Sequence, residues 1–140
     1  MTRYVVDASV GIKWFVPEIH SEAARHLINI RCELLVPDLF FPEIGNILWK
    51  RVRRGEDTAE NARQTYADLR LVPMQVYESV PLASLALEIA LHSGRTVYDS
   101  LYLSLAILKQ CSMITADLKL FNALKNSALA SNLTWIEAVI

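Results

Sequence analysis

Residues 4–7, Tyr4-Val5-Val6-Asp7, are a short run of one aromatic and two β-branched residues that ends at an acid. This composition is typical of a buried strand, because aromatic and β-branched side chains pack well on a pleated surface. Similar short apolar runs recur at residues 34–36, 72–77, 112–115 and 134–136. The sequence therefore predicts five short strands, of which Tyr4–Val6 is the first.

Helical spacing of apolar residues fills the segments between these strands. We predict helices over residues 21–30, 38–54, 58–69, 82–92, 97–109 and 117–125, with Ser21, Asp38 and Thr58 as N-caps and Gly55 and Gly94 as stop signals. Strands separated by helices pair in parallel, with helices on both faces of the sheet. The predicted fold class is α/β, a three-layer α/β/α sandwich around a mostly parallel sheet.

Composition narrows the class of protein. The 140 residues fit a single domain over residues 1–140, and 53% hydrophobic with 21% charged residues excludes a disordered chain. The formal net charge of −1 provides no overall basic field, so a polyanionic partner would need a local patch or a bound cation. Without a signal peptide or a long uncharged apolar run, we expect a cytoplasmic protein with no membrane contact.

Four acids stand where ligands bind in folds of this class. Asp7 directly follows the first strand, and Asp117 comes two residues after Thr115, at the end of the fourth. Ligands of parallel sheets bind outside the carboxyl ends of the strands. Glu43 and Asp99 each stand alone in a long apolar helical stretch, where an unpaired charge is costly. Both fall early in their helices, so both can point toward the same edge.

If these four carboxylates converge, their charges must be compensated. Two like charges ~4 Å apart repel by about 4 kcal/mol at an effective dielectric near 20. Such a group either takes up protons or holds a divalent cation. Oxygen ligands without histidine or cysteine favour Mg²⁺ or Mn²⁺ over zinc. This layout is typical of metal-assisted phosphodiester hydrolysis.

Each acid also has a structural explanation. Asp7 and Asp117 can simply cap the helices that follow them, and Asp99 stands three residues after Thr96, as in a capping box. Glu43 can pair with a buried lysine or arginine. The interpretation as a site therefore rests on the constellation, since no single acid carries it.

Three neutral polar residues accompany the acids. Asn46, about one helical turn after Glu43, can orient that carboxylate or bond a backbone carbonyl. Ser9 and Thr115 can donate hydrogen bonds to the carboxylates or serve as ordinary turn hydroxyls.

These motifs resemble those of PIN domains, and the resemblance spans nearly the whole chain. It runs through Asp7-Ala8-Ser9 followed by Lys13-Trp14-Phe15, through Pro37 to Glu43, Asn46 and Leu48, through residues 96–106, and through Thr115-Ala116-Asp117 followed by Leu120. The third of these motifs, Thr96 to Ala106, is the most specific. The length is similar to that of toxins of the VapC type, which are often a bare PIN domain.

The resemblance implies a fold, a site and partners. It implies an α/β/α sandwich whose pocket binds Mg²⁺ or Mn²⁺ through Asp7, Glu43, Asp99 and Asp117, with Thr115 as a helper. It also implies cleavage of single-stranded or loop RNA, a homodimer, and a cognate VapB-type antitoxin that lays an apolar helix and a blocking tail on the toxin. Ser100 departs from the alanine that is commoner at its position.

A basic cluster closes the helix predicted over residues 38–54. Its members are Lys50, Arg51, Arg53 and Arg54. Cations at a helix C-terminus are favoured by the helix dipole, so a solvated helix end explains them. An RNA track or a contact with the antitoxin is the alternative.

Two other functional classes compete with the nuclease. A phosphatase of the haloacid-dehalogenase type needs Asp-x-Asp after its first strand, but Ser9 takes the second position here. A receiver domain needs paired acids near the first strand and a lone aspartate after a middle strand, and neither is evident. No glycine-rich phosphate-binding loop occurs in this chain, which has only four glycines. A catalytically silent PIN-like protein that only binds RNA or a partner is the non-enzymatic alternative.

Overall fold

The computed structural model describes residues 1–139, and its centre is a five-stranded parallel sheet. The strands are β1 (Thr2–Val6), β2 (Cys32–Pro37), β3 (Gln75–Tyr77), β4 (Ser112–Thr115) and β5 (Leu133–Trp135), in the order β3-β2-β1-β4-β5. All four pairings are parallel. The predicted fold class is therefore confirmed. From β1 the chain adds strands first on one side (β2, β3) and then on the other (β4, β5), and ligands of such sheets bind at this switch between β1 and β4.

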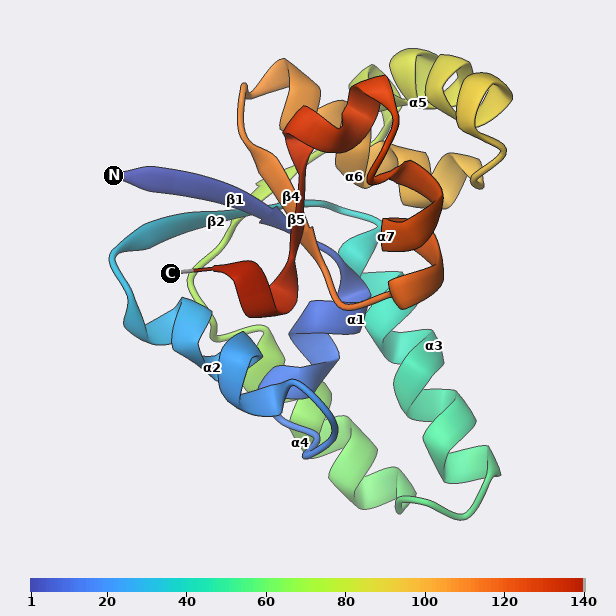
Figure 1. Ribbon diagram of the computed structural model, residues 1–140. Helices are drawn as coiled ribbons and strands as arrows, with labels where there is room; N and C mark the ends of the chain where they lie inside the picture. Colours follow the sequence, from blue (N-terminus) through green and yellow to red (C-terminus); the bar gives the residue numbers. More distant parts are fainter. Residues whose placement is uncertain (140) are drawn as a thin grey trace.

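Helices cover both faces of this sheet. They are α1 (Ala8–Gly11), α2 (Ser21–Asn29), α3 (Phe40–Arg53), α4 (Ala59–Leu69), α5 (Val80–Ser93), α6 (Val97–Leu108) and α7 (Leu118–Leu124). Short 3₁₀ turns occupy Ile12–Trp14, Ala128–Asn132 and Ile136–Ala138. In Figure 1, α5 and α6 lie on one side of the sheet and α1 and α2 on the other, while α3 and α4 form a helical hairpin that extends away from it.

The central strands are buried toward their carboxyl ends, where both faces of the sheet are covered. Val5 and Val6 are consecutive residues of β1 that point to opposite faces, and both are fully buried. Helix α6 packs on β1, β2 and β4, and every residue from Ser100 to Ala106 is buried. This packing explains why the stretch that contains Asp99 is so apolar.

The structure confirms some predicted helix ends and corrects others. Thr58 caps α4 by accepting a hydrogen bond from Asn61 N, and Gly94 ends α5 with a positive φ of 76°. The prediction for Ser21 is wrong, because Ser21 is the first residue of α2 and its hydroxyl donates to Val16 O.

The prediction that Asp38 caps α3 is also wrong. That helix begins two residues later, at Phe40, and its capping residue makes no side-chain hydrogen bond. The Asp38 carboxylate instead accepts hydrogen bonds from the backbone N and the hydroxyl of Ser79. It thereby joins the end of β2 to the start of α5, a contact across 41 residues that local sequence does not indicate.

Within residues 1–139, none of the helices is both long enough and apolar enough to cross a lipid bilayer.

Two glycines give a matched test of the packing around α1 and α3. A Cβ at Gly11 would lie 2.5 Å from Phe40 Cζ, and Phe40 is fully buried, whereas a Cβ at Gly45 meets nothing within 4 Å. We expect Gly11→Ala to destabilise the protein by about 1–3 kcal/mol through overpacking. Gly45→Ala, in the middle of α3, should stabilise it by about 0.5–1 kcal/mol. Urea unfolding measures both, and equal effects of the two changes would contradict the packing described.

Candidate functional site

Asp7 is the most completely held of the four predicted acids. It follows β1 and caps α1, where its Oδ1 accepts hydrogen bonds from Val10 N (3.1 Å) and Ser9 Oγ (2.5 Å). Its Oδ2 accepts one from Thr115 Oγ1 at 2.6 Å. Only 7% of Asp7 is exposed. Both carboxylate oxygens thus point into a fixed hydrogen-bond network at the carboxyl ends of β1 and β4.

Thr115 and Ser9 join Asp7 to the end of β4. The Thr115 hydroxyl donates to Asp7 and accepts a hydrogen bond from Asp117 N at 3.1 Å. The Ser9 hydroxyl likewise donates to Asp7 and accepts from Ala116 N at 3.1 Å. Each hydroxyl therefore orients the carboxylate and also satisfies a backbone N–H of the turn after β4. Both roles predicted for these hydroxyls, donors to the carboxylate and turn hydroxyls, are therefore present together.

Glu43 lies in the first turn of α3 and reaches toward α6. Its Oε1 accepts a hydrogen bond from the hydroxyl of Tyr102 at 2.5 Å, and Tyr102 is only 2% exposed. No lysine or arginine of the described chain forms an ion pair with Glu43. Within residues 1–139, Glu43 is therefore held by a tyrosine hydroxyl and not by an ion pair.

Asp99 lies in the first turn of α6, beside an arginine. Its carboxylate pairs with Arg95 Nη2 at 3.2 Å, and the two side chains are 28% and 26% exposed. The capping of α6 falls to Thr96, whose Oγ1 accepts a hydrogen bond from Asp99 N at 3.0 Å. The carboxylate of Asp99 is thus not needed for the cap.

Asp117 caps α7, as the structural explanation held, because its carboxylate accepts a hydrogen bond from Leu120 N at 3.2 Å. A cap uses one oxygen of the carboxylate here and leaves the other available. Asp7 also caps a helix with one oxygen, Oδ1, while its other oxygen accepts a hydrogen bond from Thr115.

The four acids influence one another electrostatically. Burial raises the pKa of Asp7 to about 6, against the lowering effect of its hydrogen bonds, and the charge of Asp117 adds to the rise. Burial also raises the pKa of Asp99, with a further contribution from Asp117 and an opposing one from Arg95. Burial raises the pKa of Glu43, with the charge of Asp99 adding to it. The carboxylates therefore form one chain of mutual repulsion: Asp7, Asp117, Asp99 and Glu43.

The donor set fits a hard divalent cation that keeps part of its water. Among residues 1–139, no three side chains of aspartate, glutamate, histidine or cysteine come together tightly enough to enclose an ion by themselves. Mg²⁺ seldom needs such a cage, because it usually binds one or two carboxylates and retains several waters. A cation at this edge would also relieve the repulsion that raises the pKa values of Asp7, Glu43 and Asp99. The four acids as its ligands remain a prediction.

Sequence reasoning did not single out Tyr102. It stands three residues after Asp99 on α6, so the two side chains share one face of the helix. Burial raises the pKa of Tyr102, and the charges of Glu43, Asp7 and Asp99 raise it further, so its hydroxyl stays a donor. The spacing of three residues from Asp99 could have indicated that Tyr102 faces the site. A buried tyrosine in an apolar helix has many possible hydrogen-bond partners, however, so the spacing alone does not identify Glu43.

Replacing Asp7 with asparagine should show how the charge of this side chain, apart from its volume, affects the stability of the protein. The amide keeps the volume and can still bond Ser9 and Thr115, but it removes a charge that burial penalises. The folded carboxyl titrates at about 6 and an ordinary one at 3.8, so the folded protein binds more protons between these values. Wild-type stability should therefore fall as pH rises through this window, and Asp7→Asn should escape the loss.

We expect the stability of Asp7→Asn, relative to wild type, to increase between pH 4 and 6 by up to about 3 kcal/mol and then stay level. Urea unfolding in EDTA measures it. Asp68→Asn is the control, because Asp68 is a partly buried acid on α4 whose carboxylate accepts a hydrogen bond from Gln64, and it should show no such trend. A variant that is less stable than wild type at pH 7.5 would show that the Asp7 charge supports the fold.

Comparison with known proteins identifies the family. A model described as "PIN domain" matches residues 4–126. Ribonuclease VapC3 of Pyrobaculum aerophilum is 35% identical over 121 residues, which cover 84% of this chain and 92% of that protein. The crystal structure of PAE2754 from the same organism has a TM-score of 0.71 at 27% identity, covering 97% of this chain and 85% of that one.

A more distant structure shares the fold. VapBC2 from Rickettsia felis, solved with a DNA fragment from its promoter, has a TM-score of 0.65 at 14% identity and covers 96% of this chain and 98% of that one. The family model covers most of the chain and includes all four acids. This chain belongs to the PIN-domain family.

Proposed function

We propose that this protein is a metal-dependent endoribonuclease that acts as the toxin of a toxin–antitoxin pair. The observation that carries the proposal is the placement of four acids: Asp7 and Asp117 follow β1 and β4, and Glu43 and Asp99 lie in the first turns of α3 and α6. The charges of neighbouring acids in this group raise the pKa values of Asp7, Glu43 and Asp99. Membership of the PIN family and 35% identity to Ribonuclease VapC3 support it. Burial and repulsion both disfavour the charged forms of these acids, and a bound cation would offset that cost.

The residues divide the work of the proposed hydrolysis. Asp7, Asp99, Asp117 and Glu43 would hold Mg²⁺ or Mn²⁺, which polarises a phosphate oxygen and lowers the pKa of a bound water. Ser9 and Thr115 fix the Asp7 carboxylate from two sides. Glu43 lines a hollow, and one of the four carboxylates would take the proton of the attacking water. The hydroxyl of Tyr102 donates a hydrogen bond to Oε1 of Glu43 and so fixes the position of that carboxylate.

Cleavage of a pool of labelled structured RNAs tests this function. Wild type should cut RNA with Mg²⁺ and not with EDTA, and Asp99→Asn should lose at least about 100-fold of the rate because a ligand charge is removed. Asp68→Asn, which changes an acid on α4 in the same way, should cut like wild type.

Each result leads to a different conclusion. Metal-independent cutting, or equal cutting by Asp99→Asn, would contradict the assignment of the site. Binding of Mn²⁺ without cleavage of any RNA in the pool would favour the alternative of a PIN-like protein that only binds RNA or a partner.

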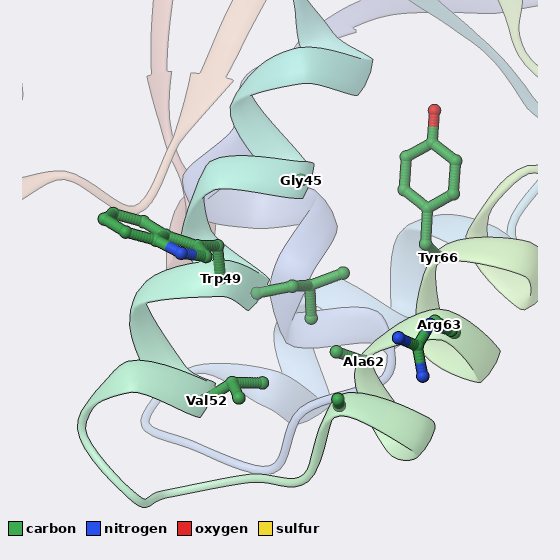
Figure 2. Close-up of a pocket in the computed structure, with 8 residues that line it drawn as sticks. Gly45, Trp49, Val52, Ala62, Arg63 and Tyr66 are labelled. Carbon is green, nitrogen blue, oxygen red and sulfur yellow. The ribbon is translucent and has the colours of Figure 1, made fainter.

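An apolar groove between α3 and α4 supports the antitoxin as partner. Figure 2 shows this groove, of about 430 Å³, with Val52 of α3 and Ala62 of α4 turned toward it. Gly45, Leu48, Trp49 and Tyr66 are among the other residues that line it, so Trp49 borders both this groove and the hollow beside Lys50. An amphipathic helix buries its apolar face in such a groove. We assign the apolar helix of a VapB-type antitoxin to it, and the homodimer and the cytoplasmic location remain predictions.

Filling this groove should uncouple toxicity from neutralisation. Ala62→Trp places a large side chain between α3 and α4, on a helix that carries none of the four acids. We expect the variant to inhibit growth like wild type when it is expressed alone, but to escape rescue by the co-expressed antitoxin. Growth curves measure both properties. Rescue as complete as for wild type would show that the antitoxin binds elsewhere.

A further inference from the structure

One face of α3 connects the acidic site to the basic end of the helix. Glu43, Asn46, Lys50 and Arg53 follow one another at intervals of three or four residues, so their side chains lie along one face. Two adjoining hollows follow this face. The first, of about 400 Å³, is lined by Glu43, Asn46 and Lys50, among others, and the second is lined by Lys50 and Arg53 together with Arg54. Lys50 lines both, so the two hollows are neighbours along α3.

The cations of this face are free of acidic partners. The three ion pairs formed among residues 1–139 involve Lys13, His20 and Arg95, and none includes Lys50, Arg53 or Arg54. All three side chains are exposed. Because the whole chain carries a net charge of −1, this is a local excess of positive charge. It adjoins an acid of the site, where a polyanion would otherwise be repelled.

Two exposed aromatic rings stand beside the same hollows. Tyr98 is 62% exposed and lines the first hollow with Glu43. Trp49 is 53% exposed and lines the second, where the Arg53 guanidinium lies 5.3 Å from the centre of its ring. In Figure 2 the Trp49 ring extends from α3 on the side away from α4. Proteins bind single-stranded nucleic acid with two kinds of group: aromatic rings that stack on bases and cations that bind phosphates. Both kinds lie side by side on this face.

We propose that this face, the α3 track, holds single-stranded RNA on its way to the acids. The track is defined by Glu43, Asn46, Trp49, Lys50, Arg53, Arg54 and Tyr98. Lys50, Arg53 and Arg54 bind successive phosphates, and Tyr98 and Trp49 stack bases. The inference rests on the proposed nuclease function and adds the direction from which the substrate enters.

The length of the track suits a short single strand. From Glu43 to Arg54 the helix rises about 16 Å at 1.5 Å per residue. At a stacked spacing of about 3.4 Å this distance holds roughly five nucleotides. A solvated helix end would explain the cations alone, but it would explain neither the hollow that Lys50 shares with Glu43 nor the two exposed rings. An A-form duplex is recognised by shape, so isolated aromatic rings favour a single strand.

The charge of the track is tested by binding, which does not depend on cleavage. The probe is a fluorescein-labelled single-stranded RNA of random sequence, 12 nucleotides long, titrated by anisotropy in EDTA at 50–200 mM KCl. Arg53→Ala/Arg54→Ala should bind at least about tenfold more weakly at 50 mM KCl, and its salt slope should fall by about 1.4, or ~0.7 for each lost phosphate contact. Arg53→Lys/Arg54→Lys should keep most of the affinity.

The matched control removes the same charge elsewhere. Arg31 precedes β2 and Arg70 follows α4, so both lie toward the opposite edge of the sheet, and both are exposed. Arg31→Ala/Arg70→Ala should bind RNA like wild type. An equal loss in both double variants would mean that only total charge matters and would overturn the track.

The aromatic contribution has a different signature. Tyr98→Ala should lower RNA affinity about fivefold or more while the salt slope stays the same, because stacking releases no counterions. An unchanged affinity would remove the stacking role. If Arg53→Ala/Arg54→Ala binds RNA as tightly as wild type, the basic face serves another ligand, such as a protein, and the proposal is wrong.

The nuclease function can fail separately. Wild type that binds the RNA through the track but cuts nothing with Mg²⁺ would support the α3 track and contradict the nuclease.

Discussion

The buried carboxylate of Asp7 is the constraint on which the rest of the site depends. It accepts hydrogen bonds from Ser9, Val10 and Thr115 and so ties the end of β1 to the end of β4, at the point where the strand order reverses. The same hydroxyls satisfy the backbone N–H groups of Ala116 and Asp117. The turn after β4, which places Asp117, therefore also holds the Asp7 carboxylate, so the positions of these two charges are fixed together.

The site therefore opposes the stability of the protein that carries it. A hydrophobic core on both faces of the sheet supplies the driving force, with α6 buried from Ser100 to Ala106. Against this gain, burial and mutual repulsion raise the pKa values of Asp7, Glu43 and Asp99. Rigid strands and helices hold such charges at fixed positions. A bound cation would relieve the repulsion among them. Activity and stability are expected to trade against each other at these positions.

Local patterns predicted the sheet well, and long-range contacts explain what they did not predict. The run Ser112–Thr115 has the bounds of β4, and the alternation of strands with helices gave the parallel sheet. The cap assigned to Asp38 was wrong because its partner, Ser79, lies 41 residues away. The partner of Glu43 is Tyr102, 59 residues away, and no local rule links them. Asp7 and Asp117 were recognisable from their positions after strands, and Glu43 and Asp99 because each stands alone in an apolar helix. Ser9 and Thr115, which hold Asp7, resemble ordinary turn residues.

The central claim is that the four carboxylates act as one cation site, and Mn²⁺ calorimetry at pH 7.5 tests it most directly. Glu43→Gln and Asp117→Asn come from different elements, α3 and the turn before α7, and each removes one charge without changing volume. The account predicts that wild type binds Mn²⁺ and that each variant binds it at least about tenfold more weakly, whereas Asp68→Asn is unaffected. Binding that is absent in wild type, or equal in all four proteins, would contradict it.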